Sequence, residues 1–312
     1  LLSPSKEKLT NLLEHFKNGR IIEAEVLAKS ITKEFPSDQF AWKILGAVFK
    51  QTGRINESII FMHRSVELDP QDAEAHNNLG VVYQELGRLE DAEASYTQAT
   101  ILQTKYIEAF INLGNVLKDQ GKFQKAVNAY KNAISLNPDY ADAHYNMGLT
   151  LKLLGKLEES NACYIKAIEL NPNHSKAYNN LGNVLQEKGK TEEAIEAYKK
   201  ALLINPDYVE AYNNIGTSLK SQGKLEESIK LFKKALLINP NYAYAHNNLG
   251  NVLKDQGKLE ESIKLFKKAI LVNPDYSDAH NNMGNALKDQ GKLDEAIDSF
   301  EKAISLEPNN SV

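Results

Sequence analysis

Asparagine recurs in this sequence at a fixed spacing, in a pattern that could bind another polypeptide. It occupies one position in seven consecutive periods of 34 residues, at Asn78, Asn112, Asn146, Asn180, Asn214, Asn248 and Asn282. A shorter series follows three positions later, at Asn115, Asn183, Asn251 and Asn285. A carboxamide donates and accepts hydrogen bonds, so it can pair with both polar groups of a peptide bond. The spacing therefore predicts a row of side chains that binds the backbone of an extended protein segment.

Histidines also recur in register and could suggest a metal site. Four of them share one repeat position: His76, His144, His246 and His280. Other repeats hold a large aromatic residue there: Trp42, Phe110, Tyr178 and Tyr212. A position that alternates between histidine and large aromatic residues is typical of packing. Neighbouring repeats about 10 Å apart also cannot bring two imidazoles onto one ion with bonds of about 2.1 Å. The single cysteine, Cys163, excludes an intrachain disulfide and a multi-cysteine zinc site. We therefore predict no metal and no cofactor.

No catalytic constellation accompanies these residues. Glutamate pairs such as Glu192–Glu193 and Glu226–Glu227 recur where the second helix of each repeat is expected to begin. Carboxylates at that place complement the positive end of the helix dipole. We interpret them as solvated charges rather than as a general acid and base, so the sequence predicts a non-enzymatic chain.

The elements that position the asparagines follow from the glycines and prolines. All 17 glycines fall into two series with a 34-residue spacing, and eight of the nine prolines keep the same period. Residues 5–310 divide into nine units: 5–38, 39–72, 73–106, 107–140, 141–174, 175–208, 209–242, 243–276 and 277–310. Such self-similarity indicates a single repeat array over residues 1–312 rather than two globular domains.

Each unit is predicted to form two helices joined by a tight turn. In residues 107–140, four residues recur with the spacing of one helical face: Phe110, Leu113, Gly114 and Leu117. Gly121 separates this segment from a second periodic one, and we expect it to adopt a left-handed backbone conformation. Gly114 lies mid-helix, where glycine costs about 1 kcal/mol, so we expect it to permit close approach of the second helix. Stacked neighbours must supply the core, which predicts an all-α solenoid.

Composition and charge exclude several classes of function. The formal net charge is −4, so the chain lacks the basic balance typical of general nucleic-acid binding. No apolar run approaches the roughly 18 residues that a membrane helix needs, and no secretory signal is recognisable. We therefore predict a cytoplasmic protein that binds proteins or extended peptides, and neither nucleic acid nor membranes.

The recurring residues match a known repeat. One series reads Trp42, Leu45, Gly46, Phe49, Ser58, Met62, Ser65 and Pro70. Another reads Tyr178, Leu181, Gly182, Leu185, Ala194, Tyr198, Ala201 and Pro206. Both resemble the tetratricopeptide repeat (TPR) pattern of large, Leu, Gly, aromatic, small, aromatic, small and Pro, over 306 of 312 residues. The resemblance implies a right-handed superhelix in which the first helix of each repeat lines a concave groove.

The resemblance also implies ways in which the asparagines could act. The row resembles the asparagine ladder in the TPR arm of O-linked N-acetylglucosamine transferases, which holds substrate backbones. Alternatively, the asparagines only solvate the groove. A carboxylate clamp, another mode of the family, needs a basic residue one position before the row, where only Lys43 fits. We interpret the chain as an interaction scaffold; the alternative is the substrate-recruiting arm of a larger enzyme such as a glycosyltransferase.

Several repeats depart from the pattern. The first carries Leu12 in place of the helical glycine and is more polar, as an end-capping repeat needs. Thr104 replaces a proline, so we expect the next helix to begin less sharply. Tyr244 is either an aromatic anchor or a packed junction residue. The last repeat leaves the helix around Phe300 without a following partner; we expect residues 311–312 to lead into a missing C-terminal region, with self-association as the alternative.

Overall fold

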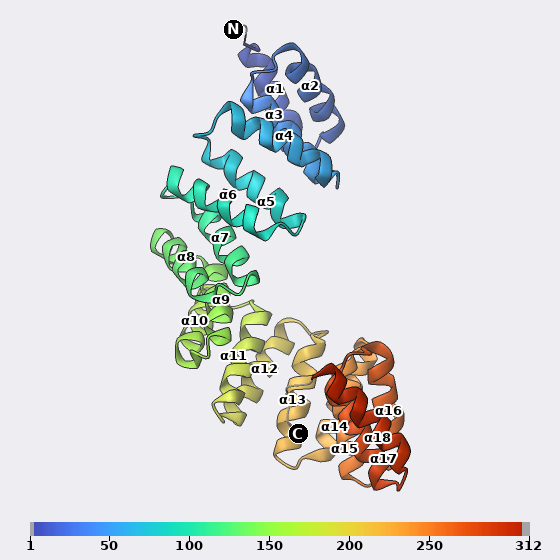
Figure 1. The fold of residues 1–312 in the computed structure, drawn as a ribbon. Helices are drawn as coiled ribbons and strands as arrows, with labels where there is room; N and C mark the ends of the chain where they lie inside the picture. The colour runs from blue at the N-terminus through green and yellow to red at the C-terminus, as the bar shows by residue number, and fades with distance from the viewer. Residues whose placement is uncertain (1–2, 308–312) are drawn as a thin grey trace. The chain divides into compact units, whose positions relative to one another are not determined.

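The computed structural model describes residues 3–307 as an array of paired helices (Figure 1). Within that range the helices are α1 (Lys6–Lys17), α2 (Ile21–Glu34), α3 (Gln39–Gln51), α4 (Ile55–Leu68), α5 (Ala73–Glu85), α6 (Leu89–Leu102), α7 (Ile107–Asp119), α8 (Phe123–Leu136), α9 (Ala141–Leu153), α10 (Leu157–Leu170), α11 (Ser175–Glu187), α12 (Thr191–Ile204), α13 (Val209–Ser221), α14 (Leu225–Ile238), α15 (Ala243–Asp255), α16 (Leu259–Val272), α17 (Ser277–Asp289) and α18 (Leu293–Leu306). They form nine helix-turn-helix pairs, which confirms the predicted all-α repeat solenoid.

The helices group into two compact units, an N-terminal unit of residues 1–163 and a C-terminal unit of residues 164–312. None of the described helices combines the length and the apolar character needed to cross a membrane. Residues 308–312, where we expected the last repeat to end and the chain to continue, lie outside the described range. The handedness of the superhelix stays a prediction.

Glycine closes the turn inside each repeat. Between α7 and α8, Gly121 has a φ of 74°, a conformation that side chains disfavour. Its N–H donates to the carbonyl of Lys118 at 2.9 Å, and the N–H of Lys122 donates to the carbonyl of Leu117 at 2.8 Å. These bonds satisfy carbonyls that the end of α7 would leave unpaired. The nine turn glycines all have φ between 71° and 79°, which confirms the predicted left-handed conformation.

The glycine in the middle of each first helix marks close packing within the repeat. A Cβ placed on Gly114 would lie 2.5 Å from the ring of Tyr130 on α8, well inside van der Waals contact. In the second repeat, the Ser58 hydroxyl donates to the carbonyl of Gly46 at 2.7 Å, so the small residue of the second helix also lies against the first. The predicted close approach is confirmed, and a large side chain, more than the small one, requires the glycine.

The first repeat reverses this arrangement. Leu12 on α1 stands at the glycine position, and Ala28 on α2 stands at the position that Tyr130 holds on α8. Both residues are fully buried. The large side chain therefore comes from the first helix and the small one from the second, a volume-conserving exchange that cores tolerate well.

The repeat that lacks the link proline is followed by a helix that starts as sharply as the others. Thr104 stands in place of proline, yet α7 begins at Ile107, the repeat position at which α9 begins with Ala141. The N–H of Tyr106 donates to the carbonyl of Gln103 at 3.1 Å, and the equivalent bond in the next repeat is 3.3 Å. The expectation of a less sharp start was wrong, because this backbone turn forms without the proline ring.

First helices of neighbouring repeats lie closer together than second helices do. In the N-terminal unit α3 contacts α5 and α5 contacts α7; in the C-terminal unit α13 contacts α11 and α15. No Cα atom of α12 lies within 8 Å of a Cα atom of α14, and the same holds for every other pair of neighbouring second helices within the described residues. Each unit therefore has an inner face of odd-numbered helices and an outer face of even-numbered helices that are spread apart.

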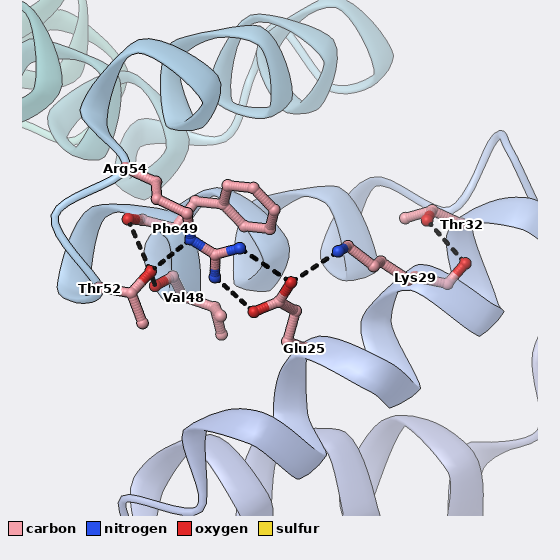
Figure 2. A network of polar contacts seen from close by, with 7 residues as sticks. All are labelled: Glu25, Lys29, Thr32, Val48, Phe49, Thr52 and Arg54. Carbon is pink, nitrogen blue, oxygen red and sulfur yellow. Dashed lines mark hydrogen bonds and ion pairs between the residues drawn. The ribbon is translucent and has the colours of Figure 1, made fainter.

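A charged network ties the first repeat to the second (Figure 2). Glu25 on α2 accepts hydrogen bonds from both terminal nitrogens of the Arg54 guanidinium, one of them at 3.0 Å, and from Lys29 at 2.6 Å. The guanidinium also lies over the Phe49 ring, 3.8 Å from its centroid. Hydrogen bonds from Arg54 and Lys29 lower the pKa of Glu25 to about 2, so the network keeps its charges at neutral pH.

Candidate peptide-binding face

The predicted asparagine row lies on the odd-numbered helices that form the inner face. All eleven side chains of the two series are half-buried, neither sealed in the core nor fully exposed. Residues three apart on a helix share one side of it, so in the four repeats that carry both series the two asparagines lie about one turn apart on neighbouring parts of the same surface. The structure thus presents the row on a partly open face, and hydrogen bonding decides which amides remain available.

Four members of the row hold neighbouring repeats together. In each, the side-chain N–H donates to the side-chain oxygen of an asparagine 35 residues earlier: Asn112 to Asn77 at 3.1 Å, Asn214 to Asn179 at 3.0 Å, Asn248 to Asn213 at 2.9 Å and Asn282 to Asn247 at 3.0 Å. The four acceptors are at most 7% exposed. A buried amide oxygen needs a donor, so these bonds have a structural role that the sequence analysis did not foresee.

The identity of the residue 35 positions earlier determines whether the bond forms. Asn78 faces Lys43 at that offset and Asn146 faces Ile111, and neither asparagine side chain has a hydrogen bond among the described residues. The signal was present in the sequence as Asn–Asn doublets. It was missed because the position before the row was considered only as a place for a basic residue.

The shorter series bonds to tyrosines of the second helix. The Tyr130 hydroxyl donates to Asn115 at 2.7 Å and the Tyr198 hydroxyl donates to Asn183 at 2.9 Å. Burial raises the pKa of both tyrosines, so both hydroxyls remain protonated donors. Two later repeats replace the tyrosine by phenylalanine, and there Asn251 and Asn285 form no side-chain hydrogen bond among the described residues.

Four amides on the inner face therefore have no hydrogen-bond partner among the described residues: Asn78, Asn146, Asn251 and Asn285. Asn180 differs, because its side-chain oxygen accepts a hydrogen bond from Asn183 at 3.4 Å. Asn78 also lines a hollow of about 550 Å³ together with Phe16, Val81 and Glu108. The inner face of the N-terminal unit thus combines an available amide with a cavity.

Lys43, the one residue that fitted a carboxylate clamp, is occupied within the structure. Its ammonium group lies 2.8 Å from Asp72 and 2.6 Å from Glu74, and the residue is 9% exposed. Burial acts to lower the pKa of Lys43, but hydrogen bonds to the two carboxylates raise it above its ordinary value. The lysine is thus bound by its own chain rather than offered to a ligand.

Comparison with known proteins places this chain in a family. The model of the cilia and flagella-associated protein 70 C-terminal domain matches residues 72–283. The chain belongs to this family. Models of the tetratricopeptide repeat match residues 277–310 and 46–87, which confirms the TPR resemblance. Such TPR domains are typically non-catalytic scaffolds that bind proteins. The family matched is not the transferase arm that the asparagine row resembles, and a comparison with curated proteins found no significant match.

Solved structures share the fold of this member of the cilia and flagella-associated protein 70 C-terminal domain family. A chain of the APC/C hetero-tetramer Cut9-Hcn1 is 18% identical, with a TM-score of 0.62, and the match covers 86% of this chain and 52% of that one. The chain thus spans about half the length of that relative. PilF of Pseudomonas aeruginosa is 19% identical, with a TM-score of 0.57, over 65% of this chain and 93% of that one. At these identities the likeness shows the TPR fold alone.

The recurring histidines of this TPR array have a packing role. The imidazole Nε2 of His76 lies 3.0 Å from the carbonyl oxygen of Pro70, and three equivalents make the same contact at 2.9–3.0 Å. Trp42, at the same repeat position, donates its indole N–H to the carbonyl of Pro36 at 2.9 Å. In these five repeats a ring N–H, from histidine or tryptophan, therefore bonds the first helix to the preceding link. Among the described residues no group of three or more metal-binding side chains occurs.

Tyr244 combines the two properties between which the sequence left a choice. Its ring centroid lies 5.5 Å from that of Tyr242 and 5.1 Å from that of Tyr276, so it is part of an aromatic cluster. It is also 52% exposed. On α15 it precedes Asn248 by four residues and Asn251 by seven, which places it on the inner face beside the row.

Proposed function

We propose that the inner face of this TPR array binds an extended segment of a partner protein. The observation that carries the proposal is the set of half-buried asparagines whose amides have no hydrogen-bond partner in the described part of the chain. In the N-terminal unit, Asn78 borders the hollow and Asn146 lies two repeats further along the row. In the C-terminal unit, Asn251 lies near the exposed ring of Tyr244. Amides and an aromatic ring on one face suit a backbone with intermittent apolar side chains.

The chemistry of the face favours moderate affinity and broad sequence tolerance. Each carboxamide can accept from one peptide N–H and donate to a peptide carbonyl. A hydrogen bond of this kind contributes about 0.5–1.5 kcal/mol net, and ordering the ligand opposes binding. Hydrophobic contact in the hollow near Phe16 adds to these terms. We expect dissociation constants in the micromolar range, equivalent to about 8 kcal/mol.

The decisive test is the double variant Asn78→Ala/Asn146→Ala. A labelled 15-residue peptide, selected from a random library on the wild-type chain, serves as the probe in fluorescence anisotropy. Loss of one hydrogen bond at each asparagine, about 1–3 kcal/mol in all, predicts binding that is roughly fivefold to 150-fold weaker, with unchanged thermal stability. Unchanged affinity of the double variant would contradict the proposal.

A matched control separates binding from folding. Asn112 occupies the same row between the two test positions, but its amide is donated to the buried Asn77. Asn112→Ala should lower stability, whereas the double variant should not. A pair such as Asn180 and Asn214 would not make this distinction, because Asn214 donates to Asn179 and Asn183.

We also propose that the partner is a component of cilia or flagella and that the chain acts there on the cytoplasmic side of the membrane. The family match over residues 72–283 supports this, since the family is described as cilia and flagella-associated. It favours a ciliary scaffold over the transferase arm. An epitope-tagged chain expressed in ciliated cells should concentrate along the cilium. A uniform cytoplasmic signal with none in cilia would contradict the proposal.

A second copy of the chain is a further candidate partner. At the last described helix, Phe300, Ala303 and Ile304 line a hollow of about 320 Å³ with residues of α17, and Ile304 is 57% exposed. We propose that this end self-associates. Sedimentation velocity should show a concentration-dependent dimer that Ile304→Asp abolishes; a monomer at high concentration would contradict it.

A further inference from the structure

The outer face of the C-terminal unit carries a row of exposed leucines. Leu203 on α12, Leu237 on α14 and Leu271 on α16 stand one repeat apart, and they are 77%, 75% and 81% exposed. A single exposed leucine is ordinary on a protein surface. Three in register on successive helices form a repeated apolar feature, and apolar patches rimmed by polar groups are typical of interaction sites. We call these residues the leucine row.

Lysines adjoin the leucine row and lack acidic partners. In the fifth repeat, Lys166 pairs with Glu169, three residues later, at 3.5 Å. The next three repeats keep the lysine, as Lys200, Lys234 and Lys268, but have the row leucines in place of the glutamate. None of these three lysines forms an ion pair within the described residues. The change from glutamate to leucine therefore creates apolar surface and frees positive charge at the same place.

Further lysines extend the positive surface along the same helices. Four more exposed lysines without an ion pair in the described part of the chain lie on α14 and α16: Lys230, Lys233, Lys264 and Lys267. Residues three and four apart share one side of a helix, so on each helix the lysines lead along one side to the leucine. Unpaired like charges repel, and an acidic ligand would relieve that repulsion.

A hollow with apolar and charged lining opens between two of the helices that carry the row. The Cα atoms of α12 and those of α14 are more than 8 Å apart, and a cavity of about 600 Å³ lies between the two helices. Ile215 and Leu219 of α13 line it together with Leu231 of α14, and all three are buried or half-buried. Lys230 stands at the same cavity, whose charged lining also includes Lys199, Lys224, Glu192, Glu196 and Glu227. The site therefore offers an apolar recess next to a free ammonium group.

We propose that this outer face binds an acidic amphipathic segment of a partner protein, whose apolar side chains pack on the leucine row and in the hollow and whose carboxylates pair with the lysines. A polypeptide fits this face better than a lipid surface does. The even-numbered helices are spread apart, so the face is ridged; a narrow chain can follow the row and fill the recess, whereas a flat bilayer would leave the recess empty.

Sequence duplication alone does not account for the pattern. Residues 222–235 and 256–269 are identical, so copying explains the agreement between α14 and α16. Helix α12 has a different sequence, yet it keeps Lys199, Lys200 and Leu203 at the corresponding places. The combination of lysines and leucine thus occurs on a helix outside the copied segment.

The test uses a labelled twenty-residue helix-forming peptide with leucines on one side and glutamates on the other. Its twin has lysine in place of glutamate, and vesicles of phosphatidylcholine and phosphatidylserine are the lipid probe. We expect the full chain to bind the acidic peptide, more weakly at high salt, and not the twin. Lys234→Glu/Lys268→Glu should weaken binding roughly tenfold, because attraction becomes repulsion, and Leu237→Ser/Leu271→Ser should weaken it similarly.

The control variant makes the same charge change elsewhere. Lys125→Glu/Lys131→Glu alters two exposed, unpaired lysines of α8 in the N-terminal unit and should leave binding unchanged. Asn78→Ala/Asn146→Ala should also bind the acidic peptide normally, which keeps this result separate from the inner-face proposal. Equal binding of the lysine twin, undiminished binding by either outer-face variant, or binding of vesicles without binding of the acidic peptide would overturn the proposal.

Discussion

The bond between Asn213 and Asn248 allows a direct test of the structural role of the asparagine row. Asn248 on α15 donates at 2.9 Å to the side-chain oxygen of Asn213, which is 7% exposed. Asn248→Ala removes this donor from a buried acceptor. Asn213→Ile removes the acceptor instead, and leaves a half-buried Asn248 that can bond to water or to Thr217, 3.4 Å away. The fifth repeat already has this second combination, with Asn146 opposite Ile111.

The two substitutions should have unequal costs. An unpaired buried polar group costs about 1–3 kcal/mol, so Asn248→Ala should lower the opening free energy of α13 and α15 by that amount. Asn213→Ile should cost under about 1 kcal/mol, because a buried isoleucine recovers hydrophobic free energy. The double variant should resemble Asn213→Ile alone, giving a coupling of about 1 kcal/mol or more.

Hydrogen exchange is the suitable assay, because repeat arrays open locally and do not unfold as one two-state unit. Amide exchange rates in α13 and α15 give the local opening free energy of each variant. Asn146→Ala is the matched control, since its amide has no partner among the described residues; we expect a change within about 0.5 kcal/mol. A loss for Asn213→Ile that equals or exceeds the loss for Asn248→Ala would refute the reasoning.

Three further predictions concern packing and pH. Gly114→Ala should destabilise the fourth repeat by about 1–2 kcal/mol, measured by amide hydrogen exchange in α7 and α8, because overpacking against Tyr130 outweighs the gain in helix propensity; a stabilised variant would contradict the close contact. Glu25, whose pKa is lowered to about 2, should contribute stability at neutral pH that is lost as pH falls from about 4.5 through about 2, and Glu25→Gln should abolish that loss in acid titrations. Burial lowers the pKa of His246, so the stability of the folded state should decrease as pH falls below 6.5, where the imidazole is protonated more readily in the unfolded chain. Thermal unfolding measured between pH 7 and pH 5 should show this decrease in the wild-type chain and not in His246→Phe.

The sequence predicted the parts of the fold that a single repeat determines. Helix faces, the left-handed turn at Gly121 and the tight contact at Gly114 all follow from positions within one 34-residue unit. The paired exchange of Leu12 with Ala28 was only half recognised, because the leucine was noticed without its partner on α2. Thr104 was overinterpreted, since a backbone turn needs no proline.

Contacts between repeats were harder to predict, because they depend on how one repeat stacks on the next. The bond from Asn248 to Asn213 joins residues 35 apart, one more than the repeat period, so the Asn–Asn doublets reveal it only when the stacking of neighbouring repeats is considered. The leucine row has a related cause. Leu202 and Leu203 are adjacent in sequence, and only the phase of α12 decides that Leu203 is the exposed one.

Under the proposed function, the asparagine row has two roles that compete for the same atoms. An amide that bridges two repeats stabilises the array and has fewer hydrogen bonds left for a ligand. Asn78 and Asn146 have Lys43 and Ile111, instead of asparagine, 35 residues earlier, and their side chains form no hydrogen bond among the described residues. Asn78 also borders a hollow. Four other amides of the row bridge neighbouring repeats instead: Asn112, Asn214, Asn248 and Asn282. Three consecutive repeats of the C-terminal unit, whose second helices are α12, α14 and α16, carry exposed leucines and unpaired lysines on the outer face. We therefore propose that the loss of the asparagine acceptor 35 residues earlier, rather than the asparagine itself, marks a binding position of the row in this array.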